Sequence, residues 1–268
     1  MQLALPVEEI ITAYRGGATL DQLAAARGCT AWSIKHRLRQ AGVNLRRRGP
    51  RRSYTLNENF FDQIETEQQA YWLGFLLADG RVSRTGAGNW VCRTDLATVD
   101  REQLVQLAAA VGSNAPIKPG HDGESVYLDL CSVKFCQRLM ELECGPAKTS
   151  QHGTPVVPYG LLRHFYRGFV DGDGSLYPVF GCGSWRFDAL GSPKFIRQFQ
   201  QWLVVNAGVS YTKLLTPDNS PASLVVRYTG GPQILRIASL LYTDATVYLA
   251  RKYAQFCKLR SSRGGFKT

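Results

Sequence analysis

Apolar side chains near the beginning of the chain recur at the spacing of short amphipathic helices. From Val7 to Tyr14 they follow the i, i+3, i+4, i+7 pattern, and a Gly-Gly pair then ends the helix. Thr19 opens a second helix with a glutamine three residues later, and Thr30 is placed to cap a third. We therefore expect residues 1–45 to form a small all-helical domain.

The third predicted helix separates apolar from basic side chains. Ile34 and Leu38 would be buried, which leaves a polar and basic surface. A helix of this kind at the end of a helix-turn-helix lies in the DNA major groove, where short polar and basic side chains reach base edges and phosphates. The candidate DNA contacts are Ser33, Lys35, His36, Arg37 and Arg39. The alternative is a helical bundle with an ordinary solvated basic face.

An arginine-rich segment follows and predicts a linker over residues 46–56. Its arginines surround a Gly-Pro break, and the segment holds too few apolar residues for a core. Such linkers can lie along the minor groove, where A·T tracts concentrate negative potential. The candidate contacts are Arg46, Arg47, Arg48, Arg51 and Arg52. A targeting signal or simple solvation would give the same pattern.

The remaining chain contains an internal repeat. Residues 70–80 and 165–174 are both apolar helical stretches with small residues four apart, and both end in Asp-Gly. Further helices and alternating strands follow each stretch at similar distances. Each half therefore predicts helix, two strands, helix, two strands, helix, and duplication makes this stronger than either motif alone. We predict an α+β fold with two pseudo-symmetric αββαββα units, 57–160 and 161–268.

Two carboxylates stand at the ends of the repeated helices. If the helices pack through their small residues, Asp79 and Asp173 meet at two helix C-termini, where the partial charge is already negative. These small residues are Gly74 and Ala78 in the first helix and Gly168 and Gly172 in the second. Divalent cations would relieve this repulsion, and oxygen ligands at a wet site suit Mg²⁺. The natural chemistry is phosphodiester hydrolysis. The bland alternative, a helix that simply ends in Asp-Gly, does not account for two matching copies.

Two local features of the repeat give further expectations. The glycines after the aspartates, Gly80 and Gly174, suit the left-handed position that ends a helix. A calcium loop beginning at Asp171 is excluded, because Leu176 stands where such a loop needs glycine and Cys182 where it needs glutamate.

Composition and charge limit the classes of molecule that this protein could bind. The 268 residues carry a net charge of +11, which favours a polyanion, although basic solubility would look the same. Residues 1–56 hold ten basic and three acidic side chains, residues 57–153 hold eight and thirteen, and residues 154–268 hold fourteen and five. No stretch is long and apolar enough to span a membrane, no secretory signal is readable and the seven cysteines form no C-x-x-C pair. We expect a cytoplasmic, nucleoid-associated protein that is not secreted.

The repeated segments resemble the motif of LAGLIDADG homing endonucleases. Residues 169–174, Phe-Val-Asp-Gly-Asp-Gly, are a near-ideal match, and residues 72–80 are a looser one. Two copies in one chain are similar to the monomeric branch of that family, over residues 57–260, and the leading helices resemble an accessory DNA-binding domain of some relatives. The first motif has Leu77 where the second has Asp171, a position that is not the metal ligand in the family.

The resemblance implies a saddle of two four-stranded sheets over the DNA major groove, with the motif helices at the interface. Asp79 and Asp173 would be the catalytic residues and metal ligands that cut both strands across the minor groove. Mg²⁺ is the expected cofactor, with Mn²⁺ able to substitute and Ca²⁺ supporting binding without cleavage. Whether the backbone near residue 78 also binds metal stays open. The expected partner is double-stranded DNA, with no membrane, no obligate protein partner and a monomeric chain.

The family also places a basic residue near each scissile phosphate. Lys148 and Lys252 stand at similar positions and are expected to polarise the phosphate or orient water, with Arg251 as a rival to Lys252. A surface lysine is the alternative for each. Asp95 and Asp188 lie near the ends of the second strands and could hold metal-associated water.

Base reading is expected from side chains that alternate toward one face of each sheet, although a slip of one residue would turn every side chain over. The candidates are Arg81, Ser83, Arg93 and Lys118 in the first half and Tyr177, Arg186, Lys213 and Arg227 in the second. Two other functions remain open: a DNA-binding regulator that has lost cleavage, and an RNA maturase. The paired aspartates favour a nuclease, because neither alternative requires them.

Overall fold

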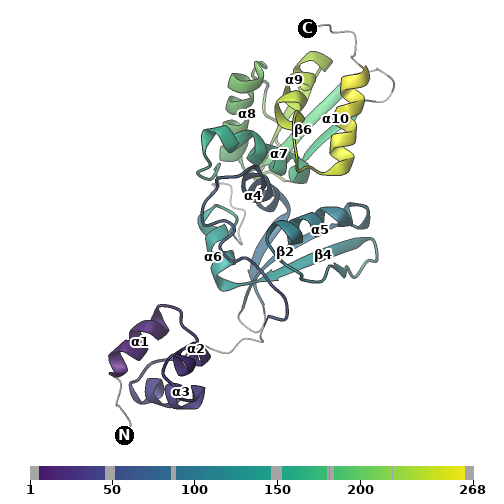
Figure 1. The fold of residues 1–268 in the computed structure, drawn as a ribbon. Coiled ribbons are helices and arrows are strands. Elements are labelled where there is room, and N and C mark those ends of the chain that lie inside the picture. The colour runs from purple at the N-terminus through teal and green to yellow at the C-terminus, as the bar shows by residue number, and fades with distance from the viewer. Residues whose placement is uncertain are drawn as a thin grey trace. The chain divides into compact units, whose positions relative to one another are not determined.

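The fold was analysed in a computed structural model that describes residues 6–45, 52–85, 89–145, 153–179, 181, 184–218 and 220–262. The chain divides into two units, Met1–Arg51 and Arg52–Thr268, each with its own hydrophobic core (Figure 1). Within the described ranges, no helix combines the length and the apolarity needed to cross a bilayer.

The first unit consists of three helices, as the sequence predicts. They are α1 (Val7–Arg15), α2 (Leu20–Ala25) and α3 (Ala31–Gln40). Thr19 forms the predicted capping box with Gln22, and the Thr30 side chain accepts a hydrogen bond from the backbone of Ser33. Ile34 and Leu38 of α3 are buried against α1 and α2, so the basic residues of α3 lie on its outer side.

The first half of the second unit follows the predicted order of helices and strands. Its elements are α4 (Glu67–Asp79), β1 (Gly80–Arg84), β2 (Trp90–Ala97), the 3₁₀ turn η1 (Thr98–Asp100), α5 (Arg101–Ala110), β3 (Lys118–Pro119), β4 (Ser125–Cys131) and α6 (Val133–Glu141). The strands form one antiparallel sheet in the order β1-β2-β4-β3.

The second half repeats this order with one difference. It contains η2 (Tyr159–Leu161), α7 (Leu162–Asp173), β5 (Gly174–Pro178), β6 (Trp185–Gly191), α8 (Pro193–Ala207), β7 (Leu224–Thr229), α9 (Gly231–Tyr242) and α10 (Ala250–Ser262). The sheet is antiparallel in the order β5-β6-β7. In place of a fourth strand, Leu215 makes a single bridge to Val225. The predicted α+β fold is confirmed and both sheets are antiparallel, but the second sheet has three strands among the described residues where four were expected.

Each sheet has one buried face and one exposed face, because its side chains alternate. In β4, Val126, Leu128 and Leu130 are buried while the residues between them are partly exposed. The buried faces pack on helices and belong to one hydrophobic core, in which α4 and α7 lie side by side between the halves (Figure 1). The exposed faces are therefore left for contacts with another molecule.

The prediction that Gly80 and Gly174 adopt left-handed conformations is wrong. Both are extended, with φ of −76° and −100°, and both begin a strand directly after the helix. Glycine is needed there for a different reason. A Cβ atom on Gly80 would lie 2.5 Å from the carbonyl oxygen of Leu76, and one on Gly174 would lie 2.7 Å from that of Val170.

Candidate functional site

The two repeated helices, α4 and α7, touch backbone to backbone. A Cβ atom on Gly74 would lie 1.9 Å from the carbonyl oxygen of Phe165, and one on Gly168 would lie 1.9 Å from that of Tyr71. The contacts are reciprocal, which reflects the pseudo-symmetry of the repeat. Any side chain at either glycine would push the helices apart, so the predicted packing through small residues is confirmed.

This contact brings the C-terminal ends of α4 and α7 together. The helices end at Asp79 and Asp173. A Cβ atom on Gly172 would lie 2.3 Å from the Cβ atom of Ala78 and 3.1 Å from Oδ2 of Asp79. The Asp79 carboxylate therefore lies against the last turn of α7, where Asp173 is also placed. The two residues predicted to act together therefore end two helices that are in contact at their last turns.

Lys252 of α10 reaches the same place from the second half. Its side chain is buried, and Nζ donates to the carbonyl oxygens of Val170 (2.7 Å), Asp171 (2.6 Å), Gly172 (3.2 Å) and Gly174 (2.6 Å). These are carbonyls at the C-terminal end of α7, so the ammonium group caps that helix. Burial lowers the pKa of Lys252 to about 8, although the carboxylates of Asp171, Asp79 and Asp173 favour its charged form.

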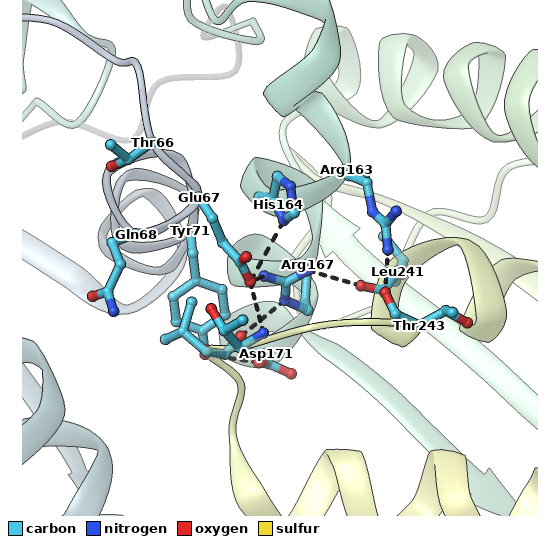
Figure 2. Close-up of polar contacts among 12 residues, drawn as sticks. Thr66, Glu67, Gln68, Tyr71, Arg163, His164, Arg167, Asp171, Leu241 and Thr243 are labelled. Atoms are coloured by element: carbon cyan, nitrogen blue, oxygen red, sulfur yellow. Dashed lines mark hydrogen bonds and ion pairs between the residues drawn. The ribbon is translucent and has the colours of Figure 1, made fainter.

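Asp171, the acid that the first motif lacks, is fully enclosed (Figure 2). It accepts hydrogen bonds from the hydroxyls of Tyr71 (2.7 Å) and Tyr242 (2.6 Å) and from the backbone N–H of Leu249 (2.7 Å). Burial raises the pKa of Asp171, while Lys252 and the three hydrogen bonds oppose that rise. Asp171 therefore connects α4, α9 and the beginning of α10 and does not point toward solvent.

An ion pair between buried Arg167 and partly buried Glu67 fixes the N-terminal end of α4 (Figure 2). The guanidinium of Arg167 donates to Glu67 at 2.5 Å and to the carbonyl oxygens of Leu241 and Val247 at 3.0 and 2.9 Å. Glu67 also accepts from the backbone N–H of Thr246 at 2.9 Å. The first-half helix α4 is thereby attached to the segment between α9 and α10 that leads to Lys252.

The exposed face of the first sheet carries the four residues proposed to read bases there. Arg81 pairs directly with Arg93, and Ser83 lies two residues further along β1. Lys118 pairs with Tyr127, which also faces Asp95. By alternation, all of these side chains belong to the face opposite the core. The pairing therefore places Arg81, Ser83, Arg93 and Lys118 together.

The exposed face of the second sheet is arranged similarly. Tyr177 pairs with Arg186, and an Arg186 Nη1 atom lies 3.4 Å from the Tyr177 hydroxyl. Arg227 of β7 pairs with Asp188 of β6 on the same face. Lys213 is exposed but lies outside the strands, two residues before the Leu215 bridge. Three of the four proposed base readers are thus gathered on this sheet.

The proposed supporting residues take part in ion pairs. Arg251 donates to Asp100 at 2.8 Å, which joins α10 to the first half. Asp95 lies 4.0 Å from Arg81. Asp188 is not the counterpart of Asp95, because strand pairing aligns it with Arg93, and both of its carboxylate oxygens accept from Arg227.

Several predicted contacts lie outside the described residues, namely Lys148, Arg46, Arg47, Arg48 and Arg51. Of the linker arginines, Arg52 is described, and it donates to Glu58 at 2.7 Å and to the carbonyl oxygen of Tyr54 at 3.0 Å. Its guanidinium is therefore engaged with the second unit.

In the first unit, the outer side of α3 shows a residue that the sequence reasoning passed over. Trp32 is 69% exposed, and its ring stacks on that of His36 with centroids 5.2 Å apart. The i, i+4 spacing of two aromatic rings was the available signal. Ser33, Lys35, Arg37 and Arg39 lie on the same short helix, with exposures from intermediate to high.

The donor set at the helix junction is made of oxygen atoms. Within the ranges that the structure describes, no group of three or more His, Cys, Asp or Glu side chains is placed to hold a metal ion. The paired carboxylates of Asp79 and Asp173 are the available acidic ligands there. Mg²⁺ commonly binds through one or two carboxylates and completes its shell with water and phosphate oxygens, so this pair is chemically suited to it.

Comparison with solved structures finds similar folds among LAGLIDADG endonucleases. The meganuclease I-SmaMI bound to uncleaveable DNA aligns with a TM-score of 0.50 and 13% identity, over 72% of this chain and 90% of that one. I-LtrWI bound to target DNA gives 0.50 and 9%, over 74% and 91%. I-GzeII in complex with its DNA target gives 0.50 and 12%, over 77% and 94%. No family model and no curated protein sequence matches the chain. At these identities, the likeness concerns the fold.

Proposed function

We propose that this protein is a site-specific endonuclease that hydrolyses both strands of a DNA duplex with a divalent metal ion. The observation that supports the proposal is the reciprocal contact at Gly74 and Gly168, because it brings together the two helix ends at which Asp79 and Asp173 stand. Two acids in a place that is electrostatically unfavourable for them indicate a function for which a cation is required.

Asp79 and Asp173 would hold the metal, and its chemistry would be activation of water and stabilisation of the leaving oxygen. Mg²⁺ is the proposed cofactor, Mn²⁺ a substitute and Ca²⁺ an ion that supports binding without cleavage. The protein's own residues fix the geometry. Lys252 neutralises the carbonyl end of α7 beside both carboxylates, so that the carboxylates keep their positions before metal and DNA arrive.

The catalytic role proposed for Lys252 also has a physical basis. Its ammonium group lies within electrostatic reach of Asp79 and Asp173, so it is close to where a scissile phosphate would bind. The ammonium group of Lys252 donates to backbone carbonyls. To contact a phosphate, it would have to exchange one of these hydrogen bonds for a bond to a phosphate oxygen. Lys148 is the proposed counterpart in the first half. Arg251 is a weaker candidate because Asp100 already holds it.

DNA would be bound by the exposed sheet faces and by the first unit. The faces supply Arg81, Ser83, Arg93, Lys118, Tyr177, Arg186 and Arg227, with Lys213 from the adjoining loop. The first unit would add a second contact through α3, whose exposed side carries Trp32, His36 and Arg39 in addition to its other polar residues. The arginines that precede Arg52 would follow the minor groove. The protein would act as a monomer, because both aspartates belong to one chain.

Cleavage of selected duplexes tests this proposal. Full-length protein would be used in EDTA to select bound duplexes from a randomised pool, and Mg²⁺ would then be added to the complexes. We expect double-strand cuts at one position in the selected sequence. Tight binding without cutting in either Mg²⁺ or Mn²⁺ would overturn the nuclease and favour a DNA-binding regulator, and preference for RNA over duplex DNA would favour a maturase.

A further inference from the structure

The exposed sheet faces contain two ion pairs that match in position and are reversed in charge. Arg93 of β2 donates from Nε and Nη2 to the two oxygens of Asp129 on β4, at 2.7 and 2.9 Å. Arg227 of β7 donates from the same two atoms to Asp188 on β6, at 2.8 and 2.9 Å. In both cases, one flat guanidinium is clamped by one carboxylate on the neighbouring strand.

Strand pairing shows that these are the same two places in the repeat. Gly80 pairs with Thr94 in the first sheet and Gly174 pairs with Ala189 in the second. Arg93 precedes Thr94 in the first half, and Asp188 precedes Ala189 in the second. On the next strand, Arg93 pairs with Asp129 and Asp188 pairs with Arg227. The two halves thus contain one clamp each, with the arginine on the second strand in one half and on the third strand in the other.

The clamp leaves part of each arginine facing outward. A guanidinium has five N–H donors, and the carboxylate uses one from Nε and one from Nη2. Of the three remaining donors, one on Nη1 and one on Nη2 lie side by side at the outer end of the guanidinium, and the third, on Nη1, points back toward the side-chain stem. The side chains of Arg93 and Arg227 are 40% and 38% exposed, whereas those of Asp129 and Asp188 are 18% and 16% exposed. The carboxylates therefore lie deeper than the guanidinium groups, and the outward edges of the two arginines are accessible to another molecule.

The guanidinium of Arg93 is also held by an aromatic neighbour, because it lies 4.1 Å from the ring centre of Tyr127. The hydrogen bonds to Asp129 and Asp188 raise the pKa of both arginines. An arginine fixed in this way loses little conformational entropy when it binds a planar partner.

Charge balance argues against a simple phosphate contact. The arginine and the carboxylate of each clamp cancel in charge, so the pair itself adds little to the salt-dependent attraction that phosphates produce, and in the first sheet Lys118, 4.0 Å from Asp129, is the cation left for that attraction. Its outward edge presents two parallel donors and no acceptor. In the major groove, guanine alone offers two adjacent acceptors, N7 and O6, whereas adenine and cytosine each present a donor. The clamp therefore matches guanine better than any other base.

We propose that Arg93 and Arg227 each read one guanine in the major groove, held in position by Asp129 and Asp188. This inference rests on the proposed DNA-binding function and specifies part of the target. Arg93 is on the strand next to β1, whereas Arg227 is two strands from β5, and neighbouring strands lie about 4.8 Å apart. The two guanines are therefore not symmetric about the cut. The target would thus be asymmetric at these positions.

Binding of selected duplexes and their single-base variants provides the test. Wild-type protein in EDTA is expected to prefer guanine at two positions, by about 10- to 100-fold over each other base. Arg93→Ala should abolish the preference at one position and leave the other, and Arg227→Ala should do the reverse. Asp129→Asn and Asp188→Asn should weaken the same preferences while binding to unrelated duplexes stays equal or tightens, because a negative charge is removed.

A charge-swapped variant controls for folding. Arg93→Asp combined with Asp129→Arg keeps the ion pair but gives the first half the arrangement of the second. It should retain affinity for DNA and shift the guanine preference to a neighbouring position. Unchanged preferences in the swapped variant, or an equal loss of affinity for all sequences in Arg93→Ala, would overturn the inference. A wild-type protein without preference for any duplex would instead overturn the proposed function itself.

Discussion

The Nζ atom of Lys252 lies 2.6 Å from the carbonyl oxygen of Asp171, and it also reaches three other carbonyls at the end of α7. Lys252 is buried, and the carboxylates of Asp79 and Asp173 both favour its charged form. A single side chain therefore links the folding of the helix junction to its electrostatics.

Replacement of this lysine should destabilise the protein. Lys252→Met removes the donor from four carbonyls and leaves Asp171 without its nearest cation, which should lower the free energy of unfolding by about 3–5 kcal/mol. Urea unfolding measures this change. The control is Lys258→Met on the exposed side of α10, which should shift the free energy by less than about 0.5 kcal/mol. Equal stabilities of the two variants would show that Lys252 does not cap α7.

The helix crossing makes a second prediction. Gly168→Ala would place a methyl group 1.9 Å from the carbonyl oxygen of Tyr71, so the two helices must separate. We expect a loss of about 3 kcal/mol in unfolding free energy, at the upper end of overpacking effects. Gly160→Ala, where no heavy atom lies within 4 Å of the added Cβ, is the matched control. Denaturation with near-identical midpoints for both variants would contradict the crossing geometry.

The buried hydroxyl of Tyr71 leads to a third prediction. It donates to Asp171 and accepts from Nε2 of Gln103, so Tyr71→Phe removes one of the three donors to Asp171 and takes the hydroxyl acceptor away from the buried Gln103 amide. The expected loss in unfolding free energy is about 1–3 kcal/mol. Tyr159→Phe is the control, because Tyr159 is exposed and its hydroxyl donates to Asn206. This variant should change the free energy of unfolding little. A Tyr71→Phe variant as stable as the control would show that the network is not needed for folding.

Stability should depend on pH through His164 and Glu67. Burial and the charge of Arg167 lower the pKa of His164 from its ordinary 6.5, so the unfolded chain takes up that proton first and stability falls as the pH drops below about 6.5. Burial favours protonated Glu67, but its bonds from Thr246 and Arg167 outweigh this and lower its pKa. The stability from Glu67 is present above about 4.5 and is lost as the pH falls further.

His164→Gln separates the two effects. The variant should show a flatter loss of stability between pH 6.5 and the onset of the Glu67 effect, measured by urea unfolding across that interval. Glu67→Gln should instead lower stability at neutral pH, because the buried Arg167 would lose its charged partner. Parallel profiles for His164→Gln and wild type would exclude His164 as the source.

How much of this could be predicted from the sequence depends on the range of each interaction. The helices, the repeat, Asp79, Asp173 and the alternation on the sheets follow local patterns, and the structure contains them. The clamp of Arg93 by Asp129 joins strands 36 residues apart, so it depends on a register that alternation alone does not give. The single bridge at Leu215, in place of a fourth strand, likewise depends on how strands pair across long distances.

Other features depend on three-dimensional burial. In the sequence, Lys252 cannot be told from a surface lysine of α10. Only the packing of α10 on α7 shows that it is enclosed. The conformation of Gly80 was predicted from the usual way in which helices end, whereas the strand that follows immediately requires an extended residue there. Asp171 resembled one more motif acid until its three donors were located.

Strand-resolved cleavage by single aspartate variants tests the central claim most directly. A selected duplex labelled on both strands would be incubated with wild type, Asp79→Asn and Asp173→Asn in Mg²⁺, and binding of each protein would be measured in EDTA. The paired site predicts that wild type breaks both strands, while either replacement abolishes double-strand breaks and leaves the dissociation constant for DNA nearly unchanged. Double-strand cleavage that persists in both variants would contradict the account.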